Sequence, residues 1–100
     1  MFDYAEKVKA RLKQILGANL SEWIRKNTKP ILYEIPRDSL KVMQHRVIDR
    51  FNTGFMITRE YEFFIDSEKN VYIQVTTAKL NFDNTRENQN ERKFIIKEGL

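Results

Sequence analysis

Cysteine is missing from this chain of 100 residues, and histidine occurs once, at His45. The absence of cysteine excludes disulfide bonds, thiolate metal sites and a thiol nucleophile, and it is typical of a protein in a reducing compartment. A single imidazole has no second histidine with which to share acid–base chemistry or a transition-metal ion. We therefore expect a non-enzymatic protein with no catalytic residues, no metal site and no cofactor.

Glycine and proline are also scarce, with three and two residues. Three isolated glycines cannot build the phosphate-binding loops of the Walker or dinucleotide type. No apolar run approaches the roughly 20 residues that a membrane span requires, and the first residues resemble neither a signal peptide nor a lipidation motif. We expect a cytoplasmic protein without a membrane partner.

The composition itself is that of a globular protein, at 41% hydrophobic, 12% aromatic and 32% charged residues. A chain of this length can bury one hydrophobic core without metal or disulfide support. We predict one domain over residues 1–100. The stretch 83–91 contains no apolar residue and is predicted to be a polar loop within that domain.

Apolar residues recur at helical spacing near the start of the chain, which predicts a first helix over residues 3–16. Asn19 followed by Glu22 resembles a capping box that opens a short second helix ending before Pro30. Residues 31–35 are rich in β-branched and aromatic side chains, which predicts a short edge strand. A third helix is predicted between Pro36 and Gly54. Its apolar face would comprise Leu40, Met43, Val47 and Phe51.

Phe55, Ile57, Tyr61, Phe63 and Ile65 follow a two-residue period that predicts a strand over 55–65, and 71–82 predicts its antiparallel partner across a turn at 66–70. Residues 94–96 are assigned to a further short strand. The predicted order is α-α-β-α-β-β-β. This order is typical of an α+β domain whose helices pack on one face of a small antiparallel sheet built around a long hairpin.

Positive charge is concentrated in the first half of the chain. Residues 1–50 contain eleven Lys/Arg and six Asp/Glu, a net charge of +5, whereas residues 51–100 contain seven and eight, a net charge of −1. The basic side chains flank the apolar stripe of the first helix and continue along the second, beside the only tryptophan. The candidate binding residues are Lys7, Lys9, Arg11, Lys13, Trp23, Arg25, Lys26 and Lys29. Alternatively, the basic side chains cover the edge of the core and Trp23 belongs to it.

Two features that could indicate chemistry have simpler interpretations. His45 falls opposite the apolar face of the predicted third helix, where a solvent-exposed polar residue is expected. Glu60 and Glu62 share one strand face and could hold Mg²⁺, but a solvated sheet face produces the same alternation.

The segment Val75–Phe82 (Val-Thr-Thr-Ala-Lys-Leu-Asn-Phe) and the Asn/Glu-rich residues after it resemble a strand end in small basic anti-CRISPR proteins of type II systems. Such proteins are encoded by phages and conjugative elements of low-GC bacteria, and they block an RNA-guided DNA nuclease by binding the nuclease or its guide RNA. The resemblance implies binding roles for Lys79 and Asn81. An exposed strand end is the alternative explanation of both residues.

Two functional hypotheses follow. In the first, the protein inhibits a nucleic-acid-handling complex such as a type II CRISPR nuclease, and its partner is a protein or a protein–RNA complex. In the second, it is a small basic DNA- or RNA-binding regulator of winged-helix type, with nucleic acid as its partner. The strand and Pro36 stand where the recognition helix of such a regulator would directly follow, which argues against the second hypothesis.

Overall fold

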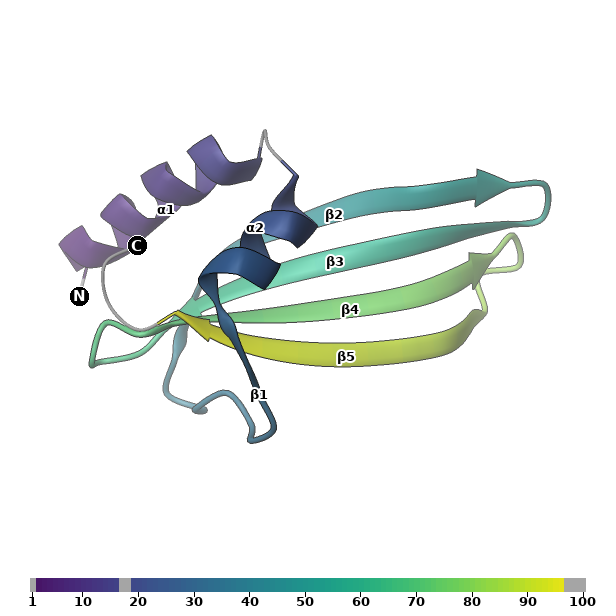
Figure 1. The fold of residues 1–100 in the computed structure, drawn as a ribbon. Helices are drawn as coiled ribbons and strands as arrows, with labels where there is room; N and C mark the ends of the chain where they lie inside the picture. The colour runs from purple at the N-terminus through teal and green to yellow at the C-terminus, as the bar shows by residue number, and fades with distance from the viewer. Residues whose placement is uncertain (1, 17–18, 97–100) are drawn as a thin grey trace.

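The computed structural model describes residues 2–16 and 19–96. In these ranges two helices precede five strands: α1 (Phe2–Leu16), α2 (Leu20–Asn27), β1 (Lys29–Ile31), β2 (Leu40–Asn52), β3 (Phe55–Ile65), β4 (Val71–Asn81) and β5 (Arg86–Ile96). The strands form one antiparallel sheet in the order β1-β5-β4-β3-β2. Both helices lie over the same face, and the far ends of β2 to β5 extend beyond them (Figure 1). The predicted α+β class is confirmed. None of the described helices is long and apolar enough to cross a membrane.

The helices begin and end where the local sequence predicts. The Asn19 side chain accepts a hydrogen bond from the Glu22 backbone N–H at 3.2 Å, which caps the start of α2. At the other end the Thr28 N–H donates to the Ile24 carbonyl at 3.0 Å. Helix α1 starts one residue before its predicted bound and ends at the predicted one.

The hydrophobic core lies between the helices and the sheet face that they cover. Val8 and Leu12 of α1 are 1% and 0% exposed, and they belong to one cluster with Phe63, Ile65 and Ile73 of the two central strands. Odd-numbered residues of β3 and β4 point into this cluster because side chains alternate across a strand. The even-numbered residues therefore belong to the opposite face, which we call the open face because no helix covers it.

The predicted third helix is wrong, because residues 40–52 form strand β2. The pairing register of β2 with β3 shifts between Lys41 and Met43 and again between Ile48 and Arg50. Each shift inserts one extra residue into β2. The first shift places Leu40 and Met43, three residues apart, opposite Ile65 and Phe63. Met43 and Val47 lie four residues apart because the polar His45 stands between them on the same strand face. A β-bulge and a polar residue thus give this part of the strand the apparent spacing of a helix.

The predicted polar loop at 83–91 is also wrong for most of its length, because β5 begins at Arg86. Residues 86–92 are all exposed, yet their backbone pairs with β4. Strand pairing needs only backbone donors and acceptors, so a polar stretch can extend a sheet once its neighbour is in place. The short strand predicted over residues 31–35 is misplaced, because β1 covers residues 29–31 and shares only Ile31 with that range; it lies at an edge of the sheet, where it pairs with β5.

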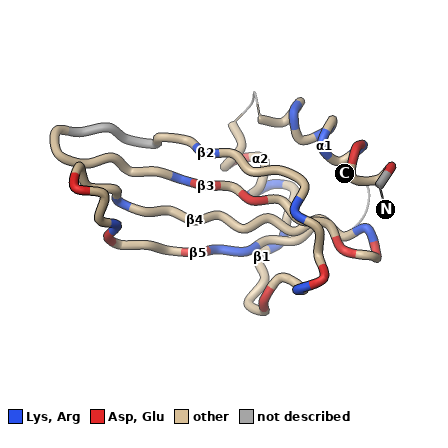
Figure 2. The backbone as a smooth tube through the Cα atoms, turned by 180° about the vertical axis from the view of Figure 1, so that it is seen from behind, with Lys and Arg blue, Asp and Glu red and all other residues tan. Residues whose placement is uncertain are grey.

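The segment 32–39 joins β1 at one edge of the sheet to β2 at the other. Four strand spacings amount to about 19 Å, and eight extended residues reach at most about 26–29 Å, so this connection has little slack. It crosses the open face near one end of the strands (Figure 2). Glu34 forms an ion pair with Lys93 of β5 at 3.4 Å.

Tyr72 of β4 is 4% exposed. Its burial, together with the hydrogen bond to Asp66, raises the pKa of Tyr72 to about 12.

Asp66 organises the turn between β3 and β4. Its carboxylate accepts hydrogen bonds from the backbone N–H groups of Glu68 and Asn70 at 2.9 and 2.8 Å, from the Asn70 amide at 3.0 Å and from the Tyr72 hydroxyl at 3.1 Å. Burial opposes ionisation of this carboxyl, but the four hydrogen bonds outweigh it and lower the pKa of Asp66. A lowered pKa in the folded state means that the ionised form stabilises the fold.

We expect Asp66→Ala to lower the free energy of unfolding by about 1–3 kcal/mol at neutral pH, because the buried donors lose their acceptor. The contribution is present above the ordinary aspartate pKa of about 3.9 and is lost as the pH falls through the lower folded pKa, so the difference from the wild type should shrink near about pH 3. Urea denaturation at both pH values measures it. Asp83→Ala is the control: Asp83 accepts from the Thr85 N–H and hydroxyl in the exposed turn before β5, and its loss should matter far less. An equal effect of the two variants would contradict the role of Asp66.

Candidate functional site: an arginine-lined groove

The basic residues predicted in α1 lie along its solvent side. Lys7, Arg11 and Lys13 are exposed and Lys9 is half-buried. Lys9 forms an ion pair with Glu6 at 3.6 Å, and Arg11 donates to the Gln14 side chain at 3.0 Å. Both contacts stay within α1 and join its basic side chains to no other element.

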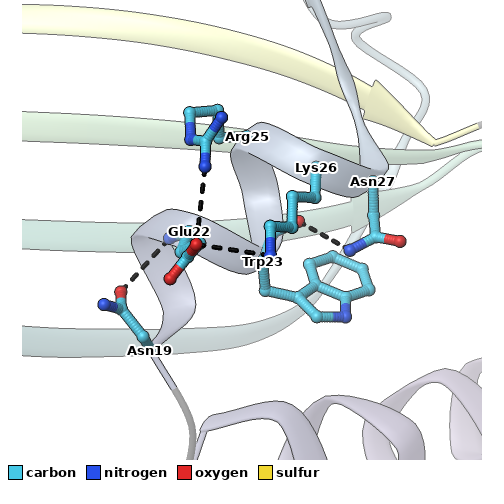
Figure 3. A network of polar contacts seen from close by, with 6 residues as sticks. All are labelled: Asn19, Glu22, Trp23, Arg25, Lys26 and Asn27. Atoms are coloured by element: carbon cyan, nitrogen blue, oxygen red, sulfur yellow. Dashed lines mark hydrogen bonds and ion pairs between the residues drawn. The ribbon is translucent and has the colours of Figure 1, made fainter.

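The basic residues of α2 share one acidic neighbour. Glu22 lies 3.4 Å from Arg25 and 3.3 Å from Lys26 (Figure 3). Lys29 is separated from them, because it pairs in register with Ile95 and therefore belongs to the open face. The predicted basic residues thus do not form one continuous surface.

Trp23 packs against the hydrophobic core and is half-buried. Figure 3 shows its ring leaving α2 toward α1, while the Arg25 side chain leaves toward β5. Of the two interpretations of Trp23, its packing favours the core.

Lys79 and Asn81 each have local partners at the end of β4. The Lys79 ammonium lies 4.7 Å from the centre of the Phe55 ring and 3.5 Å from the Glu87 carboxylate. The Asn81 amide donates to the Thr85 hydroxyl at 2.9 Å. These contacts favour a strand end stabilised by its neighbours.

A groove of about 600 Å³ lies between α2 and the sheet face that the helices cover. Its size falls within the ~300–1,000 Å³ typical of ligand sites. Three arginines from three separate elements line it: Arg25 of α2, Arg59 of β3 and Arg92 of β5. Glu22 is the one acidic residue among the lining residues, which gives them a net charge of +2. We call this site the arginine groove. The other lining residues are Asn19, Ser21, Ile24, Thr28, Pro30, Tyr61, Val75, Thr77 and Phe94.

A hydrogen-bonded cluster fixes one side of the arginine groove. The Ser21 and Tyr61 hydroxyl groups lie 3.0 Å apart, and one Arg59 nitrogen donates to both, at 3.1 Å in the case of Tyr61. Tyr61 is 2% exposed and belongs to the core. The core therefore orients the Arg59 guanidinium through a buried tyrosine, and α2 supplies the second anchor.

On the opposite side of the groove, Arg92 lies over the aromatic ring of Phe94. The Arg92 guanidinium carbon lies 5.2 Å from the centre of the Phe94 ring, within cation–π range. Phe94 is 7% exposed, whereas Arg92 is exposed. Among the described residues, no carboxylate lies within ion-pair distance of Arg92.

On the open face, Lys41, Arg46 and Arg86 have acidic partners. Glu62 lies 2.6 Å from Lys41, and Glu60 lies 2.5 Å from Arg46 and 3.7 Å from Arg86. The Arg46 hydrogen bond is the main cause that lowers the pKa of Glu60, against the opposing effect of burial. These pairs also explain Glu60 and Glu62 without a metal ion. These open-face cations each contact a carboxylate, whereas the three arginines of the arginine groove have one carboxylate, Glu22, among the residues that line it.

His45 is not the exposed helical residue that the sequence predicts. It lies in β2, is half-buried, and stacks against Tyr61 with ring centres 6.4 Å apart. In the described part of the chain, no group of three His, Cys, Asp or Glu side chains could hold a metal ion.

Sequence reasoning identified Arg25 but missed Arg59 and Arg92, which lie in the half of the chain with a net charge of −1. Each of these two arginines lies among apolar residues on one face of its strand, and this pattern was the signal in the sequence that could have identified them. No family model matches this chain, and no curated protein or solved structure matches it either. Function is therefore argued from the geometry and charge of the site.

Proposed function

We propose that this protein is a non-enzymatic inhibitor of a nucleic-acid-handling complex such as a type II CRISPR nuclease, and that it binds through the arginine groove. The single observation that supports this most is the convergence of Arg25, Arg59 and Arg92 from α2, β3 and β5 on one groove. Guanidinium groups bind phosphate and carboxylate oxygens with two parallel hydrogen bonds, which favours an anionic partner.

The shape and charge of the molecule agree with this proposal. On the open face Lys41, Arg46 and Arg86 form ion pairs with Glu60 and Glu62, which partly neutralise them. Glu22 is the one carboxylate among the residues that line the arginine groove, so an anionic partner is attracted to its three arginines. The exposed basic residues of α1 add to the same long-range attraction. An inhibitor of this kind occupies a binding surface and needs no turnover.

A small DNA- or RNA-binding regulator is the second candidate, and the same groove favours it. Its winged-helix form lacks support, because β1 follows α2 directly and the described residues include no third helix to enter a DNA groove. A regulator would bind nucleic acid alone, whereas an inhibitor binds the nuclease or its RNA-loaded complex.

A cleavage assay with purified type II nucleases tests the inhibitor function. Inhibition by the wild-type protein should saturate near one inhibitor per nuclease, because occupancy and not turnover causes it. A folded His45→Ala protein should inhibit equally well, since inhibition by occupancy needs no acid–base group. Substoichiometric inactivation that depends on His45 would overturn the non-enzymatic assignment. A lack of inhibition at large molar excess of folded protein would overturn the inhibitor function.

A matched pair of double variants locates the contact. Arg25→Gln with Arg92→Gln removes two charges from the arginine groove, and Lys29→Gln with Lys93→Gln removes two from the open face. Each pair leaves the same net charge and alters the same region of the chain. We expect the first pair to relieve inhibition and the second to have little effect. Equal behaviour of the two pairs would exclude the groove as the contact site.

A further inference from the structure

We infer that the arginine groove binds single-stranded nucleic acid, with one base stacked on the Arg92 guanidinium and the neighbouring phosphate held by Arg25 and Arg59. This inference rests on the proposed function and names the ligand chemistry of the same site. It follows from three properties of the groove: a guanidinium that lies over an aromatic ring, flanking cations, and a volume suited to a small group.

Arg92 provides the stacking surface. One side of its guanidinium faces the Phe94 ring, and that ring is itself 7% exposed. Because Arg92 is exposed and lines the groove, its other side is available to a ligand. Unpaired bases commonly stack on arginine planes and aromatic rings in proteins that bind single strands. A cation already stacked on Phe94 loses less side-chain freedom when a base is added.

Arg25 and Arg59 provide the phosphate contacts. The Arg25 side chain is 71% exposed, and its ion pair with the half-exposed Glu22 spans 3.4 Å. Exposed pairs of this kind are weak, so a phosphate can replace the Glu22 carboxylate. Arg59 is already oriented by Ser21 and Tyr61. The hydroxyl groups of Thr28 and Thr77 add polar contacts for a sugar or base edge.

The dimensions of the groove favour a single strand over a duplex. A space of about 600 Å³ beneath α2 can admit an unpaired base, whereas the bases of a duplex are paired and stacked. A duplex would leave the Arg92 plane unused and would contact the protein through phosphates alone. Proteins that read duplex DNA place a helix or a β-ribbon in the major groove, and α2 instead packs on the sheet through Leu20 and Ile24.

Fluorescence anisotropy with a labelled oligouridylate tests the inference, and the same strand annealed to its complement is the comparison. The wild-type protein should bind the single strand at least about fivefold more tightly than the duplex, because one stacked base contributes about this factor or more. Arg92→Lys keeps the charge but removes the plane, so it should remove most of this preference. Glu22→Gln should tighten binding to both probes. Lys93→Gln, on the open face of the same strand, is the charge control and should not alter the preference.

Equal affinity for single strand and duplex, or an Arg92→Lys protein that behaves as wild type, would overturn the inference. The nuclease assay separates this failure from failure of the proposed function. If Arg25→Gln with Arg92→Gln relieves inhibition but no oligonucleotide binds the wild-type groove, the inhibitor function stands and the single-strand ligand is wrong. If neither nuclease inhibition nor oligonucleotide binding is detected, both proposals are wrong.

Discussion

Replacement of Phe63 by alanine is expected to lower the free energy of unfolding by about 3–5 kcal/mol. Phe63 lies in the middle of β3 and is 0% exposed, with Met43 and Ile73 opposite it on the two neighbouring strands. Truncation removes the transfer free energy of the ring and leaves a cavity under α1 that the surrounding strands cannot close. Since domains of this size are commonly stable by about 5–15 kcal/mol, the variant should be close to unfolded at physiological temperature.

Urea denaturation followed by circular dichroism measures this effect. Phe82→Ala provides a control with the same chemical change at a site that is 62% exposed, and its midpoint should move far less. A Phe63→Ala midpoint near that of the wild type would show that β3 presents its other face to the helices.

Binding of a single-stranded oligonucleotide is expected to weaken with salt. Each phosphate contact on a single strand changes the logarithmic salt slope by about −0.7, so contacts from Arg25 and Arg59 predict a slope of about −1.4. Affinity should then fall roughly sevenfold between about 50 and 200 mM salt. Anisotropy titrations at several salt concentrations give this slope directly.

The double variant Arg25→Gln with Arg92→Gln should reduce that slope to about −0.7, because one phosphate contact remains. Lys29→Gln with Lys93→Gln should leave the slope near the wild-type value, since both residues belong to the open face. A wild-type slope near zero would mean that phosphate contacts do not hold the ligand, and it would argue against nucleic acid as the partner.

The elements that sequence analysis predicts correctly depend on local contacts. Helix α2 can be found because Asn19 caps the Glu22 N–H three residues away. The β3–β4 hairpin can be found because its eleven paired positions run without a register shift around a short turn. In both cases the residues that determine the structure are neighbours in sequence.

Strand β2 and the arginine groove could not be predicted in the same way. The two bulges of β2 are set by its pairing with β3, and they disguise its two-residue period. The groove requires Arg25, Arg59 and Arg92 to meet, and only the strand order β5-β4-β3 beneath α2 brings them together. Residues 51–100 have a net charge of −1, so a count of charge by halves of the chain does not reveal Arg59 and Arg92, which lie in that half.

The pairing of β1 with β5 also has a consequence for folding during synthesis. Residues 29–31 bond to residues 93–95, so this edge of the sheet closes only after nearly the whole described chain has been made. Until then the two helices, β1 and β2 are made first, and then β3 and β4, each of which pairs with the strand made just before it. The arginine groove has no Arg92 wall at that stage, because β5 is the last of the described strands to be made. Contacts between distant parts of a sequence form slowly, so the arginine groove is completed late in folding.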